Sequence, residues 1–148
     1  PKDTPSGVVT SIVVQAFLDA YEVTKEKKFK EIAADTINFF LKDLNIMLVD
    51  NDKLCFSYTP LDKFRVHNAN LWVASTLART MVYTKLKRLK KLILKAVNFT
   101  LSDQRPDGSF YYLDTEYTQA NETRNGIDNF HTGYVIEALI DILKFLDW

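Results

Sequence analysis

An internal repeat constrains the fold of this chain more than any other feature. Residues 24–43 align with residues 84–103 at a constant shift (84 − 24 = 60). Identical residues occupy eight aligned positions, since Thr24, Lys25, Lys27, Lys30, Asn38, Phe39, Leu41 and Asp43 match Thr84, Lys85, Lys87, Lys90, Asn98, Phe99, Leu101 and Asp103. A period of this length is too long for one helix of a repeat protein, but it fits a helical hairpin with its loops. The repeat therefore predicts stacked helical hairpins.

Apolar residues at helical spacing predict where the helices lie. The expected helices cover residues 8–23, 29–44, 68–83, 86–101 and 132–146. They make two full hairpins and the first half of a third. Residues 54–59 favour a short strand before Pro60, and residues 115–126 form a polar loop. We expect Asn68 or a neighbour to cap the third helix. Residues 1–148 are thus interpreted as a single all-α domain.

Composition excludes several classes of partner. The chain has 19 basic and 19 acidic residues, so no overall charge attracts nucleic acid or an anionic membrane. No apolar run approaches the roughly 18 residues that span a bilayer. The single cysteine, Cys55, excludes an intrachain disulfide and favours a reducing compartment, which predicts a cytoplasmic protein.

Two polar clusters precede predicted helices and contain the only two histidines. They are His67-Asn68-Ala69-Asn70 and Asp128-Asn129-Phe130-His131-Thr132-Gly133. A histidine at a helix start is either a capping or loop residue without chemistry, or a base, an acid or a hydrogen-bond donor. Because both histidines occupy matching positions, we expect them to share a pocket along one rim of the helical scaffold.

Aromatic and arginine residues lie near these clusters in the sequence. The aromatic ones are Tyr58, Phe64, Trp72, Tyr111, Tyr112, Phe130 and Tyr134. Aromatic faces beside polar donors are typical of sugar-binding surfaces, with core packing as the alternative for Trp72 and Phe130. Arg65 and Arg124 either neutralise the carboxylate of a uronic acid or pair with Asp62 and Asp128.

Other chemistries have weaker support in the sequence. The basic run from Lys85 to Lys95 flanks an apolar stripe, which is typical of the solvated face of an outer helix. Cys55, His67 and His131 lack the spacing of metal ligands, and no phosphate- or dinucleotide-binding loop is present, so we expect neither metal nor cofactor. Glycoside hydrolysis needs paired carboxylates. Asp128 is the best placed acid, whereas Asp107 in Pro-Asp-Gly is a turn former.

Four motifs carry a resemblance to a family. They are Phe56-Ser57-Tyr58-Thr59-Pro60, Arg65-Val66-His67-Asn68-Ala69-Asn70, Asp107-Gly108-Ser109 and Ile127-Asp128-Asn129-Phe130-His131-Thr132-Gly133-Tyr134. In this order they resemble bacterial and archaeal α/α-toroid proteins of polysaccharide-biosynthesis loci. That family is similar in architecture to N-acylglucosamine 2-epimerases, uronyl C5-epimerases, polysaccharide lyases and six-hairpin glycosidases. Some members carry the label δ-aminolevulinate dehydratase, but that enzyme is a TIM barrel with paired lysines, and the helical repeat argues against it.

The resemblance implies an α/α toroid whose inner helices begin near Val8, Asn68 and Thr132, with carbohydrate at their starts. Family members are longer, so the chain is expected to be the C-terminal half of a larger protein. Because two and a half hairpins cannot close a toroid, we also expect self-association through exposed hairpin faces.

These observations lead to a hypothesis of an enzyme that acts on a sugar or uronate. It abstracts a proton next to a carboxylate, as an epimerase or lyase does, and hydrolysis through Asp128 is a variant. His131 or His67 is the expected base and Tyr58 the proton donor. The expected substrate-binding residues are Arg65, Asn68, Asn70, Trp72, Tyr111, Arg124 and Asn129. The alternative is a non-catalytic glycan-binding or scaffold module.

Overall fold

The computed structural model describes residues 3–122 and 124–146, and this part of the chain is mostly helical, as predicted. The α-helices are α1 (Gly7–Thr24), α2 (Lys27–Asn38), α3 (His67–Thr84), α4 (Leu89–Ser102), α5 (Thr115–Ala120) and α6 (Asn129–Phe145). A π-helical turn, η1 (Phe39–Asp43), continues α2. The strands β1 (Ile46–Leu48) and β2 (Leu54–Phe56) form one antiparallel pair.

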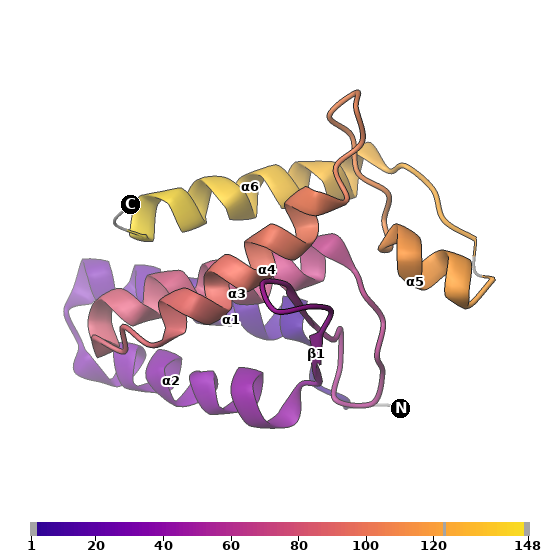
Figure 1. Ribbon diagram of the computed structural model, residues 1–148. Coiled ribbons are helices and arrows are strands. Elements are labelled where there is room, and N and C mark those ends of the chain that lie inside the picture. Colours follow the sequence, from indigo (N-terminus) through magenta and orange to yellow (C-terminus); the bar gives the residue numbers. More distant parts are fainter. Residues whose placement is uncertain (1–2, 123, 147–148) are drawn as a thin grey trace.

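Helix α3 lies at the centre of the molecule and packs against α1, α2, α4 and α6. Figure 1 shows α1, α3 and α6 running in one direction, with α2 and α4 running in the other. Residues one repeat apart therefore meet side by side: Gln15 donates a hydrogen bond to Ser75 across 60 positions. Residues of α3 and α6 that face each other are separated by a similar number of positions. The rings of Trp72 and Tyr134, for example, lie 5.9 Å apart (134 − 72 = 62). The starts of α1, α3 and α6 consequently lie at one end of the molecule.

The core explains why α3 is central. Every residue from His67 to Thr80 is buried, although only some of them are apolar. Large side chains of the main core come from α3 itself and from α2, η1, α4 and α6, and they include Ile37, Phe40, Leu71, Leu77, Leu89, Ile93 and Ile142. From α1, Val14 and Leu18 form a smaller cluster with Ala33. Small residues on α3, including Ala74 and Ala78, let these neighbours approach its backbone closely.

Helix boundaries follow the capping chemistry. Ser6 caps α1 by accepting a hydrogen bond from the Val9 N–H, and Asp128 caps α6 in the same manner. The cap of α3 is Val66, which has no side-chain acceptor. The prediction that Asn68 or a neighbour caps this helix through its side chain is therefore wrong. Asn68 lies one residue inside the helix and is buried.

The two repeat units end their inner helices alike. Lys25 and Lys85 both take the left-handed conformation, with φ of 60° and 55°, directly after α1 and α3. Their backbone N–H groups bond the carbonyls of Tyr21 and Met81. This shared C-terminal cap explains why the identical residues of the repeat begin at these turns.

Four local predictions differ from the structure. Helix α4 begins at Leu89, three residues later than expected. The expected polar loop at residues 115–126 contains α5, because Asp114 caps a short helix by accepting from the Tyr117 N–H. The second helix ends in the π-turn instead of continuing regularly to residue 44. Helix α6 begins three residues earlier than expected, at its Asp128 cap.

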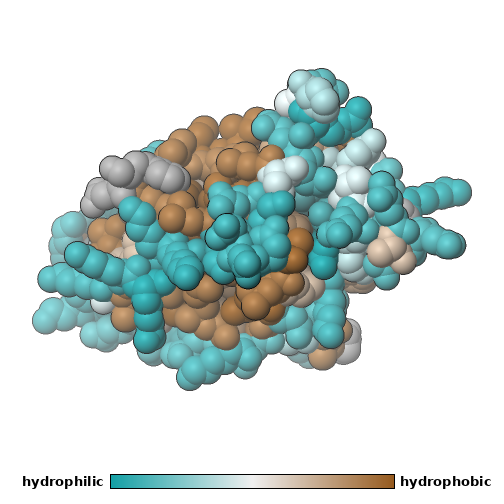
Figure 2. Space-filling view, viewed as in Figure 1, coloured by the Kyte–Doolittle hydropathy of each residue, from teal (hydrophilic) through white to brown (hydrophobic). Residues whose placement is uncertain are grey.

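The surface shows how the outer helix meets solvent. In Figure 2 a band of hydrophilic side chains follows α4, and apolar surface is visible above and below it. Lys87, Arg88 and Lys91 are exposed, in agreement with the expected solvated face. Among the described helices none combines the length and apolar character needed to cross a membrane.

Candidate functional site

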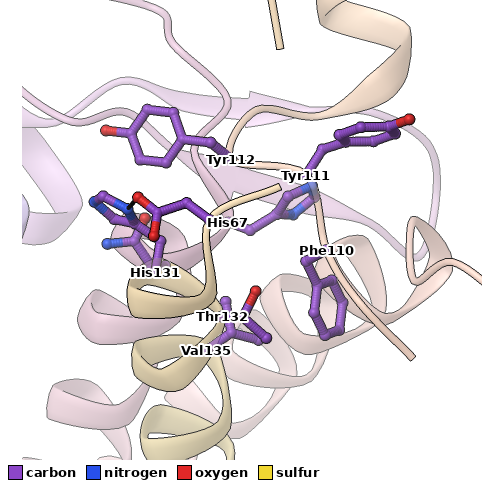
Figure 3. Close-up of a pocket in the computed structure, with 9 residues that line it drawn as sticks. His67, Phe110, Tyr111, Tyr112, His131, Thr132 and Val135 are labelled. Carbon is purple, nitrogen blue, oxygen red and sulfur yellow. Dashed lines mark hydrogen bonds and ion pairs between the residues drawn. The ribbon is translucent and has the colours of Figure 1, made fainter. Parts of the chain in front are cut away.

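The starts of α3 and α6 meet residues 110–112 at one end of the molecule and enclose a small pocket (Figure 3). Its lining residues are His67, Asn68, Phe110, Tyr111, Tyr112, Asp128, His131, Thr132 and Val135. Both histidines thus line one pocket. The empty volume is about 180 Å³, and its interior is too narrow for a water molecule. Any ligand larger than water must therefore contact the mouth of this pocket.

His67 belongs to a buried structural network. Its side chain is 1% exposed, and Nε2 donates to Asp103 Oδ2 at 2.9 Å. The same carboxylate oxygen accepts hydrogen bonds from the Thr115 N–H and hydroxyl. The imidazole also packs between the rings of Phe99 and Phe110. This network joins the start of α3 to the end of α4 and the start of α5.

The network changes the acidity of Asp103. Burial by itself raises the pKa of this carboxyl group. Hydrogen bonds from His67 and Thr115 oppose burial and outweigh it, so the pKa lies below the ordinary value of 3.8. Asp103 is therefore a carboxylate at neutral pH and a permanent acceptor for His67.

His131 has the opposite environment. Its Nδ1 lies 2.5 Å from Asp128 Oδ2, and the side chains are 33% and 46% exposed. Asp128 also accepts from the Phe130 N–H at 2.8 Å, so one carboxylate caps α6 and holds the imidazole. The hydrogen bond from His131, followed by that from the Phe130 backbone, lowers the pKa of Asp128. The imidazole is thus oriented by a carboxylate while its ring reaches solvent.

Aromatic rings surround His131 on several sides. The ring of Tyr112 lies 4.6 Å from the imidazole, and those of Phe130 and Tyr134 lie at 5.8 and 6.4 Å. Phe130 is 67% exposed, and Trp72 packs behind it against Tyr134. Core packing is therefore the role of the Trp72 ring, whereas Phe130 presents an aromatic face to solvent.

Several buried polar atoms behind this surface find no hydrogen-bond partner among the described residues. They are His67 Nδ1, Asn68 Oδ1, Trp72 Nε1 and Thr132 Oγ1. His67, Asn68 and Trp72 are each at least nine-tenths buried. Buried polar groups normally form hydrogen bonds, so a group of unpaired polar atoms at the starts of α3 and α6 is unusual.

Tyr112 is a candidate that the sequence interpretation treated only as an aromatic neighbour. Burial, followed by the nearby Tyr58 and Asp128, raises its pKa, so the hydroxyl is protonated at neutral pH. Figure 3 shows Tyr112 beside His131, with the His67 ring on the other side of the pocket. Tyr58 does not line this pocket but lines an apolar groove with Phe64, Val66, Tyr112 and Leu113. The contact between Tyr112 and His131 could not be predicted from the sequence, because it depends on the position of residues 110–113.

Arg65 and Asn70, two of the predicted substrate-binding residues, have protein partners. Arg65 pairs with Asp114 at 3.2 Å and with Glu116 at 3.3 Å, and neither is the acid that the sequence predicted. The Asn70 side chain accepts from the Phe56 N–H and donates to the Ala96 carbonyl and the Thr100 hydroxyl. Asn70 therefore joins α3 to β2 and α4.

Of the remaining predicted residues, Tyr111 lines the pocket, and the others lie around its periphery. Asp62 accepts hydrogen bonds from the backbone of Tyr58 and Thr59 and so stabilises its own loop. Tyr111 lies under the Arg105 guanidinium, 4.8 Å from the ring centre. Arg124 and Asn129 are exposed at the approach to α6.

Two further predictions concern a turn and the cysteine. Asp107 bonds the Ser109 N–H and hydroxyl, which confirms its role as a turn former. Burial raises the pKa of the Cys55 thiol far above its usual range, and the group is therefore protonated. The part of the chain that the structure describes contains no group of three or more His, Cys, Asp or Glu side chains placed to hold a metal ion.

Comparison of the chain with known protein families, with curated proteins and with solved structures found no match.

Proposed function

We propose that the protein binds a sugar or uronate at the start of α6 and that His131 removes a proton from it. The observation that carries this proposal is the geometry of His131: a half-exposed imidazole whose Nδ1 is held by Asp128 and whose ring is surrounded by aromatic side chains. With the Nδ1 proton directed at the carboxylate, Nε2 has a free lone pair and is the base.

Tyr112 supplies the matching acid in this proposal. Its ring contacts that of His131, and its raised pKa keeps the hydroxyl protonated at neutral pH. A base and an acid next to one ligand carbon are the minimum for epimerisation or β-elimination beside a carboxylate. Tyr112 replaces Tyr58 as the proton donor, since Tyr112 lines the pocket that holds His131 and Tyr58 does not.

The ligand rests on the surface outside the narrow pocket. Phe130 offers an exposed face on which the C–H groups of a pyranose ring stack, while Asp128 and Asn129 are close enough in the chain to bond hydroxyl groups. Arg124 lies in the exposed approach to α6 and is the arginine proposed for a uronate carboxylate. Arg65 is not proposed for that role because Asp114 and Glu116 occupy its guanidinium.

Titration calorimetry with a panel of uronic acids, amino sugars and short anionic glycans tests the site. Wild type is compared with His131→Ala and with Tyr58→Phe, a matched variant outside the proposed acid–base pair. We expect a saccharide to bind wild type and Tyr58→Phe alike. Proton exchange into that saccharide from deuterated water, followed by NMR, is expected only while His131 is present. Unchanged exchange in His131→Ala would exclude His131 as the base.

A non-catalytic glycan-binding module is the second candidate. The observation that favours it is the double use of Asp128, which caps α6 and holds His131 as an ordinary helix-start pair would. This alternative predicts saccharide binding by wild type without proton exchange. It also predicts that His131→Ala retains most of the affinity, because Phe130 supplies the stacking surface.

We further propose that the helices belong to an α/α-toroid arrangement. The parallel course of α1, α3 and α6, with α2 and α4 outside, supports it (Figure 1). Apolar residues are exposed at both edges of this layer, with Val9, Ile12 and Val13 on α1 and Ile136, Ile140 and Leu143 on α6. Self-association through these edges is tested by sedimentation velocity, in which a concentration-independent monomer would contradict it.

A further inference from the structure

A groove with a basic border lies at the end of α3 farthest from the candidate site. It is lined by Met81, Val82, Lys85, Lys87, Lys90 and Phe145, and its empty volume is about 950 Å³. Its lining comes from the end of α3, the turn before α4, the start of α4 and the end of α6. The apolar members supply a floor, and Val82 is 51% exposed on it.

The internal repeat provides a second copy of this turn for comparison. Lys85, Lys87 and Lys90 correspond to Lys25, Lys27 and Lys30 at the 60-residue shift. Two acidic residues near these lysines differ between the copies. Glu22 and Glu26 of the first copy correspond to Val82 and Leu86 in the second. The lysines are thus retained while the acids beside them are replaced by apolar residues.

In the first copy, acidic side chains and an aromatic ring lie beside the lysines. Glu26 pairs with Lys28 at 2.6 Å, and the Lys30 ammonium lies 5.3 Å from the centre of the Tyr21 ring. Hydrogen bonds from Tyr83 and then Arg79 lower the pKa of Glu22, and Lys25 makes a smaller contribution in the same direction. The surface at this turn therefore carries both positive and negative side chains.

In the second copy, residues of other types occupy the positions of Tyr21, Glu22 and Glu26. Met81 stands where Tyr21 supplies its ring, and no acidic residue occurs from Lys85 to Ser102. Within residues 3–122 and 124–146, neither Lys85 nor Lys87 forms a side-chain ion pair. Arg79, which lies 5.8 Å from the Phe145 ring behind the groove, is paired with Asp19 and Glu22. Positive charge at the border is consequently left for an external anion.

We propose that this groove binds a free single-chain amphiphile with an anionic headgroup. The alkyl chain lies over Met81, Val82 and Phe145, and the headgroup meets Lys85 and Lys87. Burial of an alkyl chain against exposed apolar side chains is favourable, and lysine ammonium groups attract phosphate or carboxylate as point charges. A groove with an apolar floor and a basic border selects against a bare anion, which leaves the floor exposed. It also selects against an uncharged amphiphile, which supplies no anion for Lys85 and Lys87.

Titration calorimetry with decyl phosphate, below the concentration at which it forms micelles, tests this proposal on the full chain. Decanoate, butyl phosphate, inorganic phosphate and decyl glucoside are the comparison ligands. We expect decyl phosphate and decanoate to bind. Each methylene removed should weaken binding by up to about fourfold. Inorganic phosphate and decyl glucoside should bind at least tenfold more weakly than decyl phosphate.

The repeat also supplies the matched variants. Lys85→Gln/Lys87→Gln is expected to weaken decyl phosphate binding at least tenfold, whereas Lys25→Gln/Lys27→Gln should change it less than twofold. Val82→Glu, which restores the acid of the first copy, should weaken binding to a similar extent. Circular dichroism and thermal unfolding of each variant distinguish lost binding from lost folding.

Three results would overturn the proposal. One is equal weakening in both double-lysine variants, which indicates nonspecific attraction to positive charge. Another is decyl glucoside binding as tightly as decyl phosphate. The third is binding to vesicles that contain anionic phospholipid but not to decyl phosphate or decanoate, which identifies the basic surface as a membrane contact instead of a site for a free amphiphile.

Discussion

The two histidines occupy neighbouring helix starts, each with an aspartate partner, and yet their surroundings differ in almost every physical respect. His67 is 1% exposed and its partner Asp103 comes from the end of another helix, 36 positions away. His131 is 33% exposed and its partner Asp128 lies three positions earlier on the same helix start. A long-range buried pair joins parts of the fold, whereas a local exposed pair orients a ring toward solvent. The comparison shows that a shared motif type does not imply a shared role.

The largest stability effect is expected from His67→Ala. The substitution leaves a cavity between Phe99 and Phe110 and removes the donor of a partly buried carboxylate. Losses of this kind destabilise by about 3 kcal/mol. Urea unfolding monitored by circular dichroism measures the change. A loss below about 1 kcal/mol would contradict the role of His67 as a structural group.

Asp103→Asn is expected to have the next largest effect and to alter the pH dependence of stability. Because the folded pKa lies below the ordinary 3.8, the charged carboxylate stabilises the fold above that value. This stabilisation is lost as the pH falls through the lower folded pKa. At neutral pH the amide should cost about 1–2 kcal/mol through weaker hydrogen bonds to His67 and Thr115.

Unfolding free energies of wild type and Asp103→Asn, measured from pH 7 to pH 2, check this sign. The two curves should approach each other as the pH falls below 4. Parallel curves over the whole range would show that Asp103 does not supply the acid sensitivity. Asp35→Asn is the control, since Asp35 is exposed on α2.

Asp128→Asn should reduce stability less than Asp103→Asn. Asparagine still caps a helix, and the side chain it replaces is 46% exposed, so the main change is a weaker hold on His131. The ring of His131 should then sample more orientations. NMR measurement of the His131 imidazole protons in both proteins tests this, and identical chemical shifts and tautomer ratio would contradict it.

The smallest stability effect in the comparison is expected from His131→Ala. A partly exposed side chain outside the core changes the unfolding free energy by about 0.5 kcal/mol or less. The same variant should nevertheless lose the proposed proton exchange. If His131→Ala keeps nearly the stability of wild type but loses proton exchange, the two histidines have different roles. A loss of stability as large as that of His67→Ala would contradict this distinction.

Much of the fold could be predicted from periodicity and from the repeat. The 60-residue shift predicted helical hairpins, and helical spacing located five of the helices to within a few residues. The common C-terminal caps at Lys25 and Lys85 emerged only from the structure. The sequence did not reveal α5, because its single short turn depends on a cap at Asp114 more than on an apolar face. It also did not reveal the π-turn after Asn38, since the residues there continue the helical pattern.

Within the candidate site, the sequence grouped residues by proximity along the chain. It placed Asn70 and Arg65 with His67 as ligand-binding residues. In the structure Asn70 faces β2 and α4, and Arg65 meets two acids that lie 49 and 51 positions later. Asp103 was noticed only as a residue of the repeat, and nothing in its neighbourhood indicated that it would bond His67.

The sequence by itself determined the helical class, the repeat and the placement of Asp128 and His131 three positions apart before one helix, because each depends on residues within one helix or one period. The tertiary structure decided which histidine is buried, which acids meet Arg65 and which lysines border an apolar groove. Those properties depend on the packing of α3 between α1, α4 and α6, which brings together side chains that no local pattern connects. Burial and long-range pairing, which govern the charge and reactivity of such groups, are set only there.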